Sequence, residues 1–162
     1  LKAFVTDKAL KLFEKYDVLS HKELHSRYDI YVEHYAKQIN IEALAAIDMA
    51  KKQFLPSAIE YATFLADSAG SFASASLPAP VQEDLLAKVN GLVTSLYGNL
   101  TKLESAVSRA QVTGETVKQA ESYRDDVFPV MQALRADVDA LEMIVPRDMW
   151  PVPTYTELLF KL

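Results

Sequence analysis

The chain has 162 residues, half of them hydrophobic and 24% charged, which is the composition of an ordinary globular protein. Its net charge of −5 argues against nucleic acid or an anionic membrane as a partner, and no apolar run approaches the roughly eighteen residues of a membrane span. It has no cysteine, which excludes disulfides, thiolate catalysis and cysteine-ligated zinc and is compatible with a cytoplasmic location.

The first eighteen residues predict a short amphipathic helix. Thr6 or Asp7 would cap it. Its apolar side would consist of Ala9, Leu10, Phe13 and Tyr16. These residues lack the pattern of a signal peptide, and the sequence begins with Leu rather than Met, so we expect a piece excised from a longer polypeptide.

A long helix is predicted next, from Ser20 to Pro56. Ser20 and Glu23 have the spacing of a capping box, in which each side chain satisfies the other residue's backbone N–H. Tyrosines at positions 28, 31 and 35 share one face, and we favour core packing for them over an exposed interface. Pro56 should kink the helix, which would continue and fade by Gly70.

Residues 69–80 are small and rich in serine, and they end in two prolines, so they predict a loop at the tip of a helical hairpin. A third long helix follows over 81–112, begun by Pro80 and closed by a left-handed Gly114. Glycines at 91 and 98 in its interior suggest close approach of another helix.

A fourth helix is predicted over 115–145, with a kink near Asp125 caused by Pro129. Both of the last two helices carry apolar residues at spacings of three and four, which predicts an antiparallel hairpin from Val81 to Val145. Arg124 interrupts this seam and should either extend its guanidinium to solvent or meet a carboxylate. The predicted architecture is therefore a single all-α domain over 1–162, an antiparallel helical bundle with long kinked helices.

The last residues, 146–162, form an extended, proline-rich tail. Thr154 and Glu157 predict a second capping box and a final helical turn. Because the tail contains the aromatic residues Trp150 and Tyr155, we expect it to pack as a docking strap, either against its own bundle or against a partner.

Few residues suggest chemistry. His21, His25 and Asp29 are spaced to share one helix face and could hold a divalent metal, but a solvated helix start is the favoured interpretation. Paired carboxylates at 83–84 and 125–126 are interpreted as helix-end or solvated charge. No catalytic, cofactor-binding or metal-binding residue is predicted.

Two blocks of sequence carry a family resemblance. The first is RYDIYVEHYAKQINIEALAAIDMAKKQFLPSA, from Arg27, and the second is MWPVPTY with ELLF, from Met149. Together they resemble the C-terminal region of type III glutamine synthetases. Ala45, Ala46 and Val152 depart from the family pattern without disturbing the helix or the tail.

The resemblance implies part of an enzyme that makes glutamine from glutamate, ammonia and ATP with Mg or Mn, and that assembles as a dodecamer of stacked hexameric rings. It also implies that ATP, glutamate and the metals bind an upstream catalytic domain, so this chain alone should be inactive. The expected partners are that domain and neighbouring subunits. The candidate interface consists of Arg27, Tyr28, Tyr31, Tyr35, Met49, Trp150 and Tyr155. The alternatives are a free-standing helical adaptor that binds a partner helix along the Val81–Val145 hairpin, and a small metal-dependent enzyme.

Overall fold

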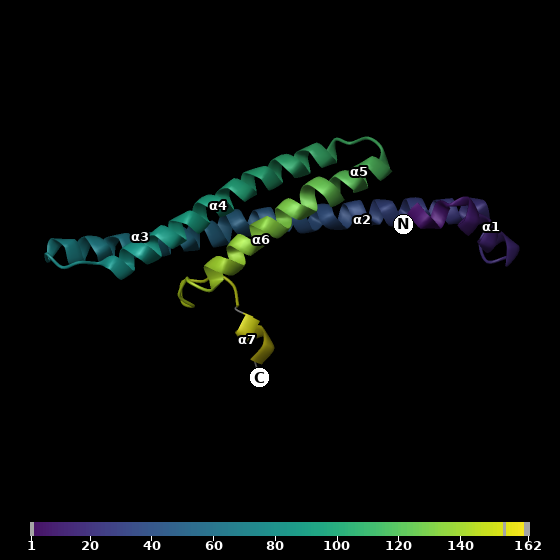
Figure 1. Ribbon diagram of the computed structural model, residues 1–162. Helices are drawn as coiled ribbons and strands as arrows, with labels where there is room; N and C mark the ends of the chain where they lie inside the picture. Colours follow the sequence, from purple (N-terminus) through teal and green to yellow (C-terminus); the bar gives the residue numbers. More distant parts are fainter. Residues whose placement is uncertain (1, 154, 161–162) are drawn as a thin grey trace. The chain divides into compact units, whose positions relative to one another are not determined.

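The computed structural model describes residues 2–153 and 155–160, without the side chains of 155 and 156. Every regular element in these ranges is helical, which confirms the all-α prediction (Figure 1). The chain forms two compact units, one of Leu1–Ala43 with Ser105–Pro129 and one of Leu44–Glu104 with Val130–Leu162. Within the described ranges, no helix is both long enough and apolar enough to cross a membrane.

The chain begins with a 3-10 turn, η1 (Lys2–Val5), and the short helix α1 (Asp7–Lys15). Thr6 is the cap, since its side-chain oxygen accepts from the Ala9 N–H at 3.4 Å. Helix α2 (His21–Met49) starts with the predicted capping box: the Ser20 N–H donates to Glu23 Oε2 at 2.8 Å, and the Glu23 N–H donates to Ser20 Oγ at 3.3 Å. Both predicted helix starts are therefore confirmed.

The buried side of α2 differs from the predicted tyrosine stripe. It consists of Leu24, Tyr28, Val32, Ala36, Ile39 and Ala43. Tyr31 is 47% exposed and Tyr35 is half-buried, so only Tyr28 of the three tyrosines belongs to the core. The reason is geometric, because steps of four from Leu24 to Ala36, followed by a step of three to Ile39, define the buried line, and Tyr31 lies on its edge.

The chain stays helical through Pro56. A π-helical turn, η2 (Ala50–Phe54), joins α2 to α3 (Leu55–Ser74), and the Leu55 N–H bonds to the Ala50 carbonyl, five residues back. A proline lacks the N–H of the ordinary ladder and clashes with the carbonyl four residues earlier. The wider π turn just before Pro56 accommodates this defect, so the helix continues past Gly70 to Ser74.

The predicted loop over 69–80 is wrong for its first half, because α3 includes residues 69–74. The helix ends where Ser76 adopts a left-handed conformation, with φ of 58°. There the Leu77 N–H bonds to the Phe72 carbonyl and the Ser76 N–H to the Ala73 carbonyl, both at 2.9 Å, which is a Schellman motif. Serine hydroxyls in this stretch bond back to helix carbonyls instead of breaking the helix.

The second half of the chain follows the predicted pattern more closely. Helix α4 (Pro80–Gln111) is followed by α5 (Thr116–Ser122), the π turn η3 (Tyr123–Val127) and α6 (Phe128–Glu142). In the second unit, α4 lies antiparallel to α3 and to α6 (Figure 1), and Ser95 and Asn99 both donate to Asp137 Oδ2, at 3.1 and 2.8 Å. The π turn η3 precedes Pro129 just as η2 precedes Pro56.

The predicted roles of the glycines are not found. No neighbouring atom lies within 4 Å of a side-chain carbon built at Gly91 or Gly98, so nothing packs closely there. Gly114 does not have a positive φ. A carbonyl at the end of α4 finds its hydrogen-bond donor in a side chain instead, because the Gln119 amide donates to the Ala110 carbonyl at 3.2 Å.

A polar junction lies inside the first unit. The side-chain oxygen of Asn40 accepts from the Tyr123 hydroxyl at 2.9 Å and from the Gln111 side-chain amide at 3.0 Å. Burial raises the pKa of Tyr123, so its hydroxyl stays protonated and remains a donor. These bonds fix α2, α4 and η3 in one register within this unit.

We predict that Ser76→Gly stabilises the protein by about 0.5–1 kcal/mol, because glycine adopts the left-handed conformation without the steric cost that serine bears. Urea unfolding would measure this change. Ser71→Gly is the matched control: it places glycine inside α3 and should destabilise by about 0.5 kcal/mol. Equal effects of the two variants would contradict this account of the helix end.

We predict a pH-dependent effect of Glu23→Ala. The hydrogen bonds from Ser20 lower the pKa of Glu23, so the stability that this carboxylate contributes is present above its ordinary pKa and is lost as pH falls through the lowered value. The variant should melt at a lower temperature than the parent at neutral pH and at the same temperature near about pH 2. A difference that persists in acid would show that the capping box is not its source.

Candidate interface

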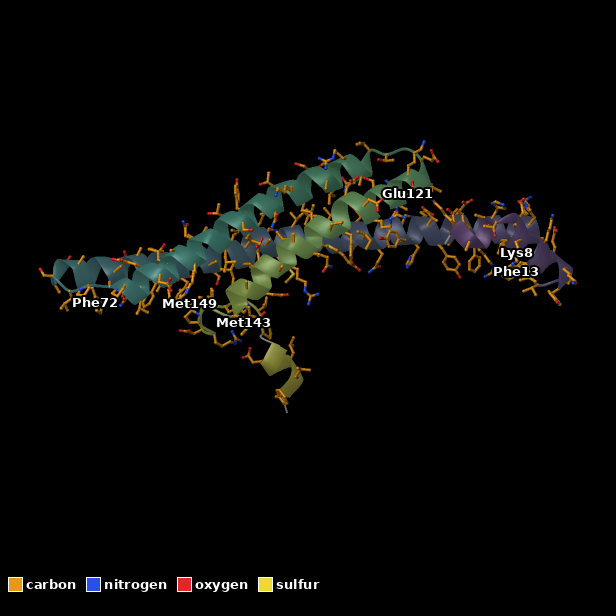
Figure 2. All side chains as sticks on the ribbon, viewed as in Figure 1. Lys8, Phe13, Phe72, Glu121, Met143 and Met149 are labelled. Atoms are coloured by element: carbon orange, nitrogen blue, oxygen red, sulfur yellow. The ribbon has the colours of Figure 1, made fainter. Side chains whose placement is uncertain are left out.

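The tail of the second unit is anchored by the chain's single tryptophan. Trp150 is only 4% exposed, and its ring stacks on Phe54 of η2, with centroids 5.3 Å apart. One residue earlier, the Met149 carbonyl accepts a hydrogen bond from the Ser57 hydroxyl of α3. Figure 2 shows Met149 beside that helix. The strap predicted from sequence therefore docks on its own unit.

The last helix is held less firmly. Helix α7 spans Tyr155–Phe160, and Thr154 of the predicted capping box lies outside the described residues. Arg147 links the tail together, because its guanidinium contacts Glu157 at 2.6 Å and donates to the Trp150 carbonyl at 3.1 Å. Figure 1 shows α7 projecting away from α6. Its side chains at 158, 159 and 160 are 65%, 75% and 75% exposed.

The seven residues proposed for the interface occupy different environments. Arg27 and Tyr31 are exposed in the first unit and line an open cleft at the start of α2. Met49, in the second unit, is 36% exposed. Tyr35 is half-buried, and Tyr28 and Trp150 are buried within their own units, so they offer little surface to a partner. The Tyr155 side chain is outside the described residues.

Other apolar residues present more surface than most of these. On α2, Ile30 is 59% exposed and Ile41 is 63% exposed. Eleven residues are close to three helical turns, so both lie on one face of the helix. Ile41 does not share the four-residue period of the buried residues Leu24, Tyr28 and Val32, which is the signal in the sequence for its exposure.

Several of the candidate charged groups form local pairs. Among the described residues, no group of three His, Asp or Glu side chains could hold a metal ion, and the rings of His21 and His25 lie tilted against each other with centroids 4.6 Å apart. Arg124 meets the expected carboxylate: it donates twice to Asp125 at 2.6 Å, which raises the pKa of Arg124 and lowers that of Asp125. At the other carboxylate pair, Asp84 contacts Lys88. These pairs are exposed and belong to the solvated surface.

Comparison with known proteins points to one family. The family model described as "Glutamine synthetase C-terminal domain" matches residues 1–72. Similar proteins include a glutamine synthetase of Butyrivibrio fibrisolvens (28% identical over 98% of this chain) and a type-3 glutamine synthetase of Dictyostelium discoideum (32% over 96%). A glutamine synthetase of Bacteroides fragilis is 24% identical over 88% of the chain. The chain spans 23%, 22% and 20% of their respective lengths.

We predict that Trp150→Ala destabilises the protein by about 3–5 kcal/mol, because it removes a buried aromatic side chain and its stacking on Phe54. Denaturant unfolding followed by circular dichroism would measure the loss. Phe160→Ala is the control for an exposed aromatic residue of the same tail, and it should change stability by less than about 0.5 kcal/mol. Similar losses in both variants would mean that α7 is as firmly packed as Trp150.

Proposed function

Since the chain belongs to the family of glutamine synthetase C-terminal domains, we propose that it is a structural and assembly domain of a long-chain glutamine synthetase. Its relatives are more than four times as long, because it spans at most 23% of them. The rest of such a polypeptide would contain the catalytic domain. In this proposal the chain carries no catalytic residue and is inactive alone.

The proposed parent reaction is the ATP-dependent ligation of ammonia to glutamate. ATP and Mg or Mn would bind the upstream catalytic domain. The whole enzyme would be a cytoplasmic homo-oligomer, a dodecamer in the proposed form. The partners of this domain would be its own catalytic domain and neighbouring subunits.

The observation that carries this proposal is a set of exposed large apolar side chains on α2. Ile30, Tyr31 and Ile41 lie in the stretch that the family model matches, and each is about half exposed or more. Ile30 and Ile41 share one side of the helix, and exposed large apolar side chains favour burial against another protein surface. A domain that covers catalytic domains or links subunits needs such apolar contacts.

The free-standing adaptor is the weaker alternative, because it needs the hairpin seam to be available to a partner helix. In the second unit that seam is already packed: Val89, Leu96, Leu100 and Leu103 are all at most 1% exposed. A partner could reach these side chains only by separating α4 from its neighbours. At these four residues the seam is therefore closed to a partner helix.

We predict that Ile41→Glu in the whole polypeptide weakens subunit assembly at least about tenfold, because an unpaired carboxylate would be placed in an apolar contact. Mass photometry across a dilution series would measure assembly, and glutamine formation would measure activity. Both should fall, since the active enzyme is the assembled one in this proposal.

The matched control is Val112→Glu, at an 83% exposed residue in the connection between α4 and α5. It adds the same charge at an exposed apolar residue outside α2, and it should leave assembly and activity unchanged. Removal of Met149–Leu162 is a coarser test, because it also removes the Trp150 anchor. An Ile41→Glu enzyme that remains a fully active dodecamer at all dilutions would contradict the proposed assembly role of α2.

A further inference from the structure

A second surface, in the second unit, has the properties of a docking site. A groove of about 490 Å³ runs between the end of α2, helix α6 and the tail, and we call it the tail groove. Its apolar walls include Met49, Phe54, Leu134, Val138, Trp150 and Leu158. Its residues come from three separate stretches of the chain, so it exists only when the tail is docked on its unit.

The edge of the tail groove along α6 is acidic. It carries Arg135, Asp139 and Glu142. Arg135 lies 3.5 Å from Asp139, so these two charges offset each other, and Glu142 leaves a net negative charge on the edge. An occupant with an apolar side and a lysine or arginine would match both the walls and this edge.

The tryptophan in the groove wall has an unsatisfied polar group. The indole N–H of Trp150 is buried and has no hydrogen-bond acceptor among the described residues. Buried polar groups in folded proteins almost always have a partner. A polypeptide bound in the groove could supply a backbone carbonyl to this buried N–H only by shifting the Trp150 ring.

Helix α7 widens the apolar surface beyond the groove. Leu158 lines the groove, while the next two side chains, Leu159 and Phe160, are each 75% exposed. The Arg147–Glu157 contact holds this helix beside the groove. The groove together with these exposed side chains presents more apolar surface than the groove alone, and it suits a helix or strap of another polypeptide segment.

We propose that the tail groove and α7 together bind an apolar segment with a lysine or arginine, from the part of the glutamine synthetase polypeptide outside these 162 residues. This inference rests on the proposed function. The size of the relatives supports this occupant, because more than three quarters of their length lies outside the region that this chain matches. The acidic edge and the chain's own net charge of −5 disfavour a second copy of this domain as the occupant.

The test places a photo-crosslinking amino acid, p-benzoylphenylalanine, at position 159 of the whole polypeptide. After irradiation, mass spectrometry of the digested enzyme would identify the linked peptide. The expected product joins α7 to a lysine- or arginine-containing segment outside the 162 residues. The same probe at Val112 is the control and should give no such product. Links only to another copy of this domain, or no link in an intact assembly, would overturn the inference.

A charge reversal tests the acidic edge. Glu142→Lys should reduce the yield of the crosslink from position 159 at least tenfold, while circular dichroism shows an unchanged helical content. Val138→Glu, in the groove wall, should reduce it similarly. An unchanged yield in both variants would overturn the proposed recognition. If Ile41→Glu still disrupts assembly while position 159 gives no crosslink, this inference fails and the proposed function stands.

Discussion

The helices of this protein depend on how the backbone accommodates two internal prolines. Pro56 and Pro129 each follow a five-residue π turn by two positions, at Ala50–Phe54 and Tyr123–Val127. In both turns the residue before the proline bonds to the carbonyl five residues back, which carries the chain past the missing N–H. Without that adjustment each proline would end its helix. The π turns also place Phe54 and Tyr123, the side chains that organise the two interiors.

The two units are organised by different kinds of contact. In the first, Tyr123 donates to Asn40, a directional bond that specifies which residues face each other. In the second, Phe54 stacks on Trp150, a contact whose contribution comes mainly from buried apolar area. The first contact fixes register, and the second attaches the tail. The aromatic residue of the π turn is therefore held by a hydrogen bond in the first unit and by apolar packing in the second.

Sequence patterns predicted those features whose causes are local. The capping box of Ser20 and Glu23, the cap at Thr6 and the helix start at Pro80 each depend on residues within one turn, and all three are present. The end of α3 was missed, because Ser76 takes a conformation usually given to glycine, while Gly114 does not take it. Local composition favours a loop over residues 69–80. The helix nevertheless continues until two backbone N–H groups donate hydrogen bonds to helix carbonyls and close the Schellman motif.

The tail groove could not be predicted, because its walls combine residues about ninety positions apart, such as Met49 and Val138. Periodicity assigns both to apolar helix faces without indicating that those faces leave a gap between them. The burial of Trp150 has a related consequence for function. Since Trp150 is buried in attaching the tail, the surface that the proposed partner would contact consists of the residues around it. A residue can therefore be essential for an interface while presenting almost none of its own surface there.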